Sequence, residues 1–550
     1  ISTLSPATEL QQQQVLYQSY CAAVRKRKEP NSFETFLGWS TPLLKDLNII
    51  DQYLIDRNDF FTYLSSLHKI RAWGESQDDI IQDYTAFWEL LPEIYQDFIQ
   101  RLEANGQTTS GKSYRMATTL LENFLQHKTS TQFIFCGFNA LSPSEAFIVQ
   151  ELLAQERAQV FWDIDKKMLE DELHQAGSFI RGYIQDWPEY KKSTFQQAHD
   201  VFHQPKKVVV TEVQQQVGQA KQIGDLLARM GEKEDWSKTA IVLADESLLM
   251  PLLYALPPSI SSLNITMGFP LNQHPLAIFV NAVLKMALRQ TSKGFFYADV
   301  ESVLSLPETQ ALFATEAPDF STAVLSKAKK EHRSYLNTSF LQAEAPKEAQ
   351  DYVDMLFRSN GSPEQWIDDI LKLLPLFYDT QGRLPIKQVY SLAAEKVTVL
   401  LHQIKELVTA LKQPLSFPLL RNLYAQLSTV QKLNFVGAPL EGLQILGVLE
   451  TRTIDFDRVL MAGVNEGILP TQTGQSSWIP YEVKKAYGLP TQDEQDAIFT
   501  YHFYRLMYRA KEVYLFYNGT TDGIQVGEPS RLIRQWAFER PPTHDWQEHT

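Results

Sequence analysis

Apolar residues recur at intervals of three and four positions along the first part of the chain, a spacing that places them on one face of a helix. The helices predicted in this way cover residues 33–47, 51–70 and 79–104. The segment TQFIFCGF at residues 131–138 is a short continuous apolar run and predicts a buried strand. A helix over residues 142–155 and a strand over residues 158–163 follow, so the helical stretch gives way to an α/β pattern.

A second alternation of strands and helices begins near residue 207. The runs KVVVTEV at residues 207–213 and TAIVLA at residues 239–244 predict strands, with a helix over residues 214–230 between them. Short β-rich runs that alternate with helices are typical of parallel α/β units. The alternation then stops, and residues 275–426 carry helical periodicity almost throughout. The strand pattern returns at residues 443–449, 458–462 and 513–517.

The simplest organisation is an α/β protein with two parallel-sheet domains and large helical insertions. A chain of 550 residues is too long for one hydrophobic core. The expected segments are a helical insertion (1–128), the remainder of a first α/β domain (129–204), a second α/β domain in two parts (205–271 and 431–538), a helical insertion within it (272–430) and a linker or frayed end (539–550).

Composition narrows the functional classes. Hydrophobic residues make up 44% and charged residues 21%, as in ordinary globular proteins, and no apolar run reaches the roughly 18–20 residues that cross a bilayer. Cys21 and Cys136 are the only cysteines and no histidine motif for a metal occurs, so we expect no metal site and a cytoplasmic location. The net charge of −14 makes nucleic acid less expected, although a local basic channel remains compatible with it.

The segment GQTTSGKS at residues 106–113 matches the phosphate-loop pattern GxxxxGK[ST] at Gly106, Gly111, Lys112 and Ser113. In such a loop, backbone amides cradle phosphates, the lysine neutralises them and the hydroxyl binds magnesium. A genuine loop follows a strand, whereas the residues before Gly106 have helical periodicity. We therefore favour a connection between two helices, ended by Gly106 and capped by a Ser or Thr. An active ATPase that uses Lys112 with ATP and magnesium is the alternative.

The segment LQILGVLETRTIDFDRVLMAGVNEGILP at residues 443–470 resembles the fifth conserved motif of UvrD-like superfamily 1 helicases and the strand after it. That family has an apolar strand ending in G-x-x-E-G-x-x-P. The matching positions here are Gly463, Glu466, Gly467 and Pro470, and Phe456 also matches. The loop before this strand departs from the pattern, because Leu449 and Glu450 replace His–Ser or His–Ala and Thr453 replaces Gly.

This resemblance implies roles for three residues near the loop. Asp455 stands where the family has a Glu near the nucleotide, and Thr451 and Arg452 occupy the side of the loop that faces DNA. An equally simple interpretation of Arg452 is an ion pair with Asp455 or Asp457.

The segment YHFYRLMYRAKEVYLFY at residues 501–517 resembles the sixth motif of the same helicases, in which T-R-A closes a helix before a strand. Arg509 matches the arginine, while Tyr508 replaces the threonine. In active relatives this arginine reaches the γ-phosphate of the nucleotide, because its planar fork suits phosphate oxygens. We favour a structural role instead, in which Arg509 compensates the helix dipole or pairs with Glu512.

The segment FIFCGFNALSPSE at residues 133–145 falls where these helicases have their second motif. Cys136 replaces the magnesium-binding Asp and Gly137 replaces the catalytic Glu. Neither residue can hold magnesium or act as a general base for water. The resemblance therefore implies a nucleotide site without its acidic pair.

The order and spacing of these motifs resemble AddB-like proteins of bacterial helicase–nuclease complexes. TAIVLADESLLMPLL at residues 239–253 looks like the opening of a second motor domain, and GEPSR at residues 527–531 resembles the stretch before a nuclease domain. The resemblance implies two RecA-like domains, the first incomplete, with 1B-like and 2B-like helical insertions. It also implies a phosphate loop upstream of Ile1 and a PD-(D/E)xK nuclease domain after Thr550.

The function expected from this resemblance is a non-hydrolysing DNA-binding scaffold, without a cofactor of its own, in an AddAB/RecBCD-type complex for double-strand break repair and recombination. Its expected partners are single-stranded DNA or a duplex end and an AddA-like helicase–nuclease subunit. A protein–protein adaptor without DNA affinity is a further alternative.

Overall fold

The structure is a computed structural model of the chain. It divides into two compact units: unit 1 comprises Ile1–Gln214 and Val448–Thr550, and unit 2 comprises Gln215–Gly447. None of the helices in the described part of the chain is long and apolar enough to cross a membrane. The expected domain boundary at residues 128–129 lies outside the described residues. The structure describes residues 4–26, 29–72, 79–127, 131–191, 197–231, 235–260, 262–377, 384–411, 414–434, 442–471, 477–520 and 527–550.

The largest sheet is parallel and has seven strands in the order β15-β5-β14-β13-β6-β12-β7. Its strands are β5 (Lys206–Val213), β6 (Thr239–Leu243), β7 (Leu263–Ile265), β12 (Leu443–Gly447), β13 (Arg458–Ala462), β14 (Glu512–Asn518) and β15 (His544–His549). The mixed α/β class predicted from the sequence is therefore confirmed at this coarse level. The predicted strand over residues 458–462 has the same bounds in the structure as β13.

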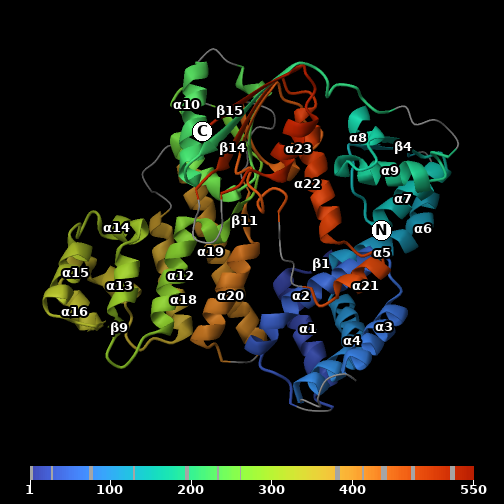
Figure 1. Cartoon of the computed structure of the whole chain (residues 1–550). Coiled ribbons are helices and arrows are strands. Elements are labelled where there is room, and N and C mark those ends of the chain that lie inside the picture. Colours follow the sequence, from blue (N-terminus) through green and yellow to red (C-terminus); the bar gives the residue numbers. More distant parts are fainter. Residues whose placement is uncertain are drawn as a thin grey trace. The chain divides into compact units, whose positions relative to one another are not determined.

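Strands that precede the long helical stretch pair with strands that follow it. In unit 1, β5 pairs with β14, from Lys207 opposite Glu512 to Val213 opposite Asn518, and Figure 1 shows the green strand beside the red one. In unit 2, β6 pairs with β12 in the same parallel sense. Every residue of β6 and of β12 is buried, as expected for strands of a parallel sheet covered on both faces.

The prediction of a linker or frayed end over residues 539–550 is wrong. The last strand, β15, pairs in parallel with β5, from His544 opposite Lys206 to His549 opposite Thr211. His544 is buried, and its Nδ1 accepts a hydrogen bond from Nε1 of Trp536 at 3.3 Å. The sequence HDWQEH conceals this strand because most of its residues are polar and half-exposed or exposed, as on the edge of a sheet.

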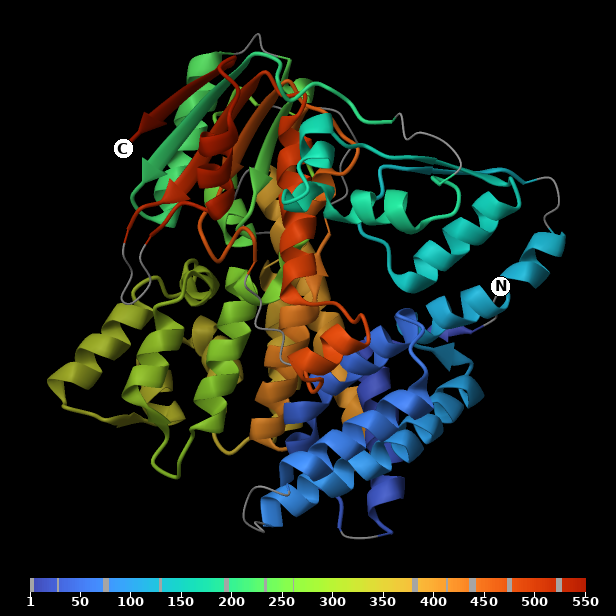
Figure 2. The same ribbon diagram turned by 45° about the vertical axis from the view of Figure 1, so that its right-hand side comes forward.

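The first part of unit 1 is a group of helices, shown in blue in Figure 2. They are α1 (Glu9–Val24), α2 (Phe33–Gln52), α3 (Arg57–Ala72), α4 (Asp79–Ala104), α5 (Ser110–Thr119) and α6 (Leu121–His127). The predicted bounds of α4 are confirmed. The predicted helix over residues 51–70 begins later, because Leu54 has a φ of 57° and the side chain of Asp56 accepts a hydrogen bond from the amide of Asp59 at the start of α3.

A small α/β segment follows these helices. It consists of β3 (Phe133–Cys136), α7 (Pro143–Ala154), β4 (Ala158–Phe161), α8 (Lys166–Glu170) and α9 (Ser178–Asp186). The parallel pair β3–β4 packs one face on a core that includes Leu121 and Leu152. The prediction of a fully buried strand is wrong for the other face, where Ile134 is 67% and Phe161 is 50% exposed.

Between residues 275 and 426 the described part of unit 2 is mostly helical, as predicted. The helices are α12 (Pro275–Leu288), α13 (Tyr297–Leu304), α14 (Pro307–Phe313), α15 (Phe320–Lys330), α16 (Thr338–Ala343), α17 (Gln350–Leu356), α18 (Pro363–Leu373), α19 (Leu384–Leu411) and α20 (Phe417–Val430). Helices α10 (Gln216–Met230) and α11 (Leu249–Ala255) precede them. Unit 1 ends with α21 (Tyr481–Ala486), α22 (Gln492–Met507) and α23 (Arg531–Glu539).

Short strands pair outside the large sheet. These pairs are β1 (Ser5–Pro6) with β2 (Gln107–Thr108), β8 (Phe269–Pro270) with β11 (Lys432–Leu433), and β9 (Phe295–Phe296) with β10 (Tyr335–Leu336).

Candidate nucleic-acid interface

The loop that resembles the fifth helicase motif begins as a single 3-10 turn, Val448–Thr451. Thr451 is fully buried in the turn, and its hydroxyl donates to the carbonyl of Val448 at 2.7 Å. Its side chain is therefore committed to the fold and does not reach solvent. The next residue, Arg452, is exposed. Of the two residues predicted to face DNA, only Arg452 presents its side chain to solvent.

The expected ion pair of Arg452 with Asp455 or Asp457 does not form. Asp455 pairs with Arg505, and Asp457 pairs with Lys511 at 3.2 Å. Among the described residues, Arg452 makes no side-chain hydrogen bond or ion pair. One exposed carboxylate, Glu450, lies in the same turn. In the described part of the chain, Arg452 is thus a solvent-facing cation without a side-chain partner.

Thr453 adopts the left-handed conformation, with a φ of 61°. A β-branched residue rarely takes this conformation, which glycine adopts freely, and glycine is the residue that the helicase pattern has at this position. The residue differs from the helicase pattern, but its φ angle is one that glycine would adopt without strain.

Thr453 also closes the region where the second motif would carry its acidic pair. Gly137 follows β3 with a φ of 69°, and a Cβ atom added to it would lie 2.0 Å from Cγ2 of Thr453. No side chain, and so no carboxylate, fits at Gly137 while this contact exists. Cys136, at the position of the magnesium-binding residue, is an exposed free thiol.

Two arginines, Arg505 in the last turn of α22 and Arg509 two residues beyond its end, converge on two carboxylates. Nε of Arg505 lies 2.8 Å and NH2 of Arg509 lies 3.1 Å from the carboxylate of Asp163. The same arginines contact Asp455 at 2.9 and 3.4 Å. The network joins the end of β4, the motif-five loop and the end of α22.

Burial and charge act in opposite directions on this network. Burial acts to raise the pKa of Asp163, but the positive charges of Arg505 and Arg509 and their hydrogen bonds outweigh it, so the pKa is lower than usual. Burial, with Arg452 and Arg505 nearby, lowers the pKa of His502 to about 3 and keeps this ring neutral. The charges of Arg505 and Arg509 are balanced by Asp163 and Asp455. Arg452, a third arginine near His502, therefore carries the unbalanced positive charge of this group.

The favoured structural interpretation of Arg509 named the wrong partner. Glu512, the predicted partner, binds Arg458 at 2.9 Å, whereas Arg509 binds Asp163 and Asp455. Both predicted nucleotide-binding residues, Arg509 and Asp455, therefore lie together and neutralise each other. The sequence interpretation missed Asp163 and Arg505, although the four-residue spacing of the two arginines was a usable signal.

Two further segments of the helicase-like pattern bind each other in unit 1. Glu466, in the stretch after β13, accepts hydrogen bonds from the amide and Nε of Arg531, both at 2.8 Å. The amide of Ser530 donates to the carbonyl of Val464 at 2.9 Å. The two segments that carry these resemblances, residues 463–470 and 527–531, are thus held together by direct hydrogen bonds.

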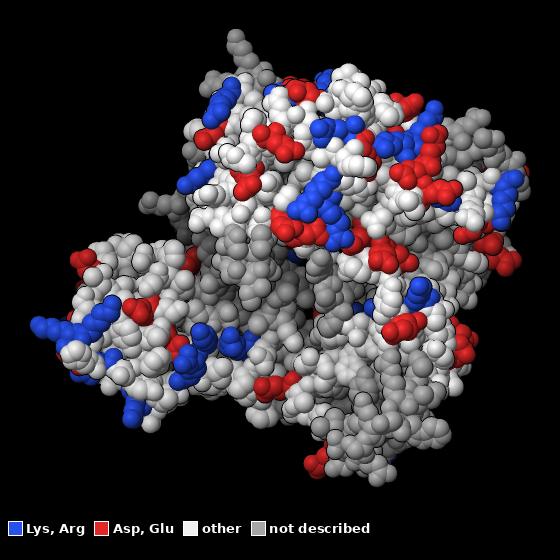
Figure 3. All heavy atoms as spheres, in the orientation of Figure 1, with Lys and Arg blue, Asp and Glu red and all other residues white. Residues whose placement is uncertain are grey.

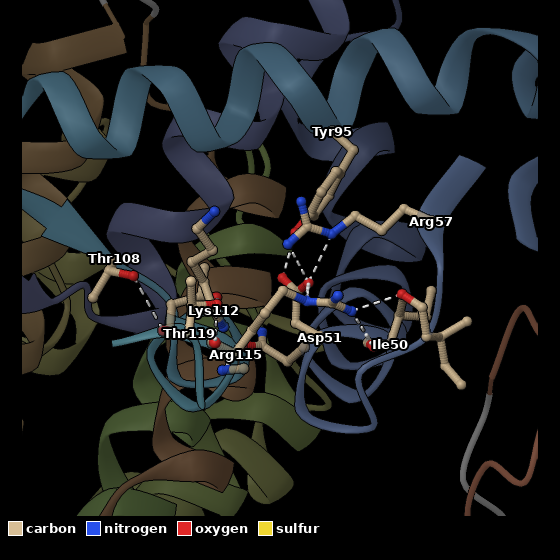
Figure 4. A network of polar contacts seen from close by, with 12 residues as sticks. Ile50, Asp51, Arg57, Tyr95, Thr108, Lys112, Arg115 and Thr119 are labelled. Atoms are coloured by element: carbon tan, nitrogen blue, oxygen red, sulfur yellow. Dashed lines mark hydrogen bonds and ion pairs between the residues drawn. The ribbon is translucent and has the colours of Figure 1, made fainter. Parts of the chain in front are cut away.

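The phosphate-loop string lies between two helices, as favoured from the sequence (Figure 4). Gly106 follows α4 with a φ of 70°, and only the two-residue strand β2 separates it from Thr109, whose side chain caps α5. Gly111 lies inside α5, where its amide donates to Oδ1 of Asn48 at 2.9 Å. The amide of Lys112 donates to the Thr109 hydroxyl at 3.2 Å. These amides are therefore occupied and cannot cradle a phosphate.

The hydroxyl that would bind magnesium in that string is also engaged. Oγ of Ser113 donates to the carbonyl of Thr109 at 2.9 Å. A Cβ atom on Gly111 would lie 2.1 Å from the carbonyl oxygen of Asn48, so this glycine is required by the packing of α5 on α2. Helix packing accounts for the glycine without a nucleotide.

A second group of cations lies in unit 2. Figure 3 shows Lys and Arg side chains gathered over α15 and α16, at the left of the view. Lys327, Lys329 and Lys330 belong to the last turn of α15, where positive charge compensates the helix dipole. Lys327 pairs with Glu344, and Lys329 lies 3.8 Å from Glu301. Most of this charge is therefore balanced locally, unlike that of Arg452.

Within the described part of the chain, no three His, Cys, Asp or Glu side chains are grouped so that they could hold a metal ion. No protein-family model matches the chain, and no curated protein matches it either.

Proposed function

We propose that the chain is a helicase-like, non-hydrolysing DNA-binding scaffold of an AddAB/RecBCD-type helicase–nuclease. In this proposal its α/β parts are RecA-like domains with 1B-like and 2B-like helical insertions. The complex would process double-strand breaks for repair and recombination in the cytoplasm, with an AddA-like subunit as the hydrolysing partner.

The observation that carries the DNA-binding part is Arg452, which is exposed and has no side-chain partner among the described residues. An arginine without an intramolecular partner can bind a phosphate without first breaking an ion pair. Electrostatic contacts with phosphates supply most of the affinity of sequence-independent DNA binding. The loop that carries Arg452 is the one whose likeness to the helicase motif first suggested a DNA contact.

The absence of hydrolysis rests on the residues around Gly137. ATP hydrolysis needs magnesium and a group that orients or activates water, and these helicases use an acidic pair for this purpose. Cys136 and Gly137 occupy the two positions, and Thr453 leaves no room for a longer side chain at the second. Arg509, the would-be γ-phosphate contact, is neutralised by Asp163 and Asp455.

Two assays on one sample test the proposal. Fluorescence anisotropy with a labelled oligothymidylate is expected to show binding that weakens in Arg452→Ala, whereas phosphate release from ATP with magnesium and this DNA stays at background. Lys511→Ala is the matched control, because Lys511 is exposed but already paired with Asp457. Hydrolysis that is lost in Arg509→Ala, or unchanged DNA binding in Arg452→Ala, would contradict the proposal.

A further inference from the structure

A cavity of about 480 Å³ lies in unit 1, beside the start of α3 and along α5. Three basic side chains line it: Arg57 from α3, and Lys112 and Arg115 from α5. The cavity wall also contains the carboxylate of Asp56. One oxygen of this carboxylate accepts a hydrogen bond from the amide of Asp59 at the start of α3. The DNA-binding proposal above makes no use of this cavity, and the phosphate-loop string touches it only through Lys112.

The two arginines are held in place by a carboxylate behind the cavity. Asp51 is 1% exposed, and its Oδ1 accepts from Nε of Arg57 at 2.8 Å and from Nε of Arg115 at 2.9 Å (Figure 4). The Tyr95 hydroxyl donates to the other carboxylate oxygen, and the Arg57 guanidinium lies 5.0 Å from the centre of the Tyr95 ring. The buried carboxylate fixes both guanidinium groups in advance of any ligand.

Each guanidinium keeps donors that Asp51 does not use. NH2 of Arg115 binds the carbonyls of Ile50 and Ile55 at 3.1 and 2.7 Å, whereas its NH1 makes no hydrogen bond among the described residues. NH1 of Arg57 is likewise without a partner there.

Lys112 contributes a third cation, and its nearest carboxylate is Glu103 at 3.7 Å. This distance is long for an ion pair, and Glu103 is 43% exposed at its side chain. Three cations and two carboxylates, the shared Asp51 and Asp56, lie at the cavity, so one positive charge there is balanced only by the exposed Glu103. Planar guanidinium groups and an ammonium around one space suit a compact anion with several oxygens.

We propose that this cavity binds a phosphate group through Arg57, Lys112 and Arg115, without magnesium. The phosphate is either the terminal phosphate of a DNA strand or that of a small phosphorylated compound, because the recognising chemistry is the same. The inference does not rest on the DNA contact of Arg452, which lies on a different segment of unit 1.

The cavity also differs from a phosphate loop that uses the same lysine. In a phosphate loop, the backbone amides of residues 106–113 and the hydroxyl of Ser113 would hold the ligand, with magnesium. Here the amides of Gly111 and Lys112 donate to Asn48 and Thr109, and the hydroxyl of Ser113 donates to Thr109. Of residues 106–113, only Lys112 lines the cavity. The Ser113→Ala substitution and the removal of magnesium by EDTA should therefore weaken binding to a phosphate loop, but not binding to this cavity.

Isothermal titration calorimetry with inorganic pyrophosphate, in the presence of EDTA, tests the proposal on the full chain. Pyrophosphate is expected to bind, and Lys112→Ala is expected to weaken binding about tenfold, the effect of losing one charge-assisted contact. Lys112→Arg should keep most of the affinity because it restores the charge. Ser113→Ala and Lys330→Ala, an exposed lysine of unit 2, should leave binding unchanged.

Arg57→Gln extends the test to a second cation, and circular dichroism melting shows whether the variant is folded. If it does not fold, the pair Lys112→Ala and Lys112→Arg decides alone. Competition with oligothymidylates that carry a 5′-phosphate or a 5′-hydroxyl then separates the sources. Stronger competition by the phosphorylated strand identifies a DNA end, and equal competition identifies a small compound. The proposal is overturned if folded protein binds no pyrophosphate, if Lys112→Ala binds as the wild type does, or if binding requires magnesium and Ser113.

Discussion

A Cβ atom placed on Gly137 would lie 2.0 Å from Cγ2 of Thr453, so the two residues exclude any side chain between β3 and the motif-five loop. Both residues have positive φ angles, 69° for Gly137 and 61° for Thr453. Gly137, which the proposed resemblance to helicases aligns with a catalytic glutamate, is therefore required by its neighbour. This contact underlies the proposal that the chain does not hydrolyse ATP.

Gly137→Ala is expected to destabilise the protein by about 2–3 kcal/mol, because it adds both a clash and backbone strain. In a Thr453→Gly background the same substitution should cost at least about 1 kcal/mol less, since the clashing methyl group is gone. Urea denaturation of the four proteins in this double-mutant cycle measures the difference. Equal costs in the two backgrounds would show that Thr453 does not restrict Gly137.

Asp163→Asn is expected to destabilise the protein by about 3 kcal/mol at neutral pH, because Arg505, only 4% exposed at its side chain, would lose one of its two carboxylates. The pKa of Asp163 is lowered in the folded state, so its stabilising effect is present above the usual Asp pKa of about 4 and is lost as pH falls through the lower folded value. Wild-type stability should therefore fall more steeply than that of Asp163→Asn as the solution is acidified below about pH 4. Parallel acid profiles in thermal unfolding would contradict this account.

Lys206 predicts a pH dependence on the alkaline side. Its Nζ is buried and donates to the carbonyls of Tyr508 and Ala510, and burial lowers its pKa from 10.5 to about 8. Below pH 8 Lys206 is protonated in both the folded and the unfolded chain, so the whole free-energy cost of burying its charge opposes folding. Between pH 8 and 10.5 only the unfolded chain keeps it, so stability rises with pH.

The variant Lys206→Met isolates this effect from other groups that titrate in the same range. The free energy of unfolding of the wild type, relative to Lys206→Met, should rise by about 3 kcal/mol from pH 7 to above pH 10. Guanidinium denaturation at several pH values measures the change. A constant difference between the two proteins would mean that the lysine keeps its ordinary pKa.

The elements predicted well from the sequence are those whose own residues decide their structure. The bounds of α4 and β13 follow from apolar spacing within each segment. The strand β15 was missed because its polar residues pair with β5, more than 300 positions earlier in the chain, and no local pattern records that contact. A short edge strand with few apolar residues has the composition of a linker.

The candidate site shows the same division. The sequence motifs predicted Arg452, Asp455 and Arg509 as site residues, but the residues that contact them are set by the folded chain. Arg505 binds Asp163 across 342 positions of sequence, and the same carboxylate also pairs with Arg509. The burial of Thr451 follows from a 3-10 turn that the spacing of apolar residues does not reveal.

The most direct test of the central claim is the salt dependence of single-stranded DNA binding by the wild type and Arg452→Ala. Log affinity of the wild type should fall linearly with log salt concentration, and Arg452→Ala should weaken binding and reduce the slope by about 1, the loss of one phosphate contact. Glu450→Gln should strengthen binding, because it removes the exposed carboxylate from the same turn. A folded chain that binds no single-stranded DNA at low salt, or an unchanged slope in Arg452→Ala, would contradict the account.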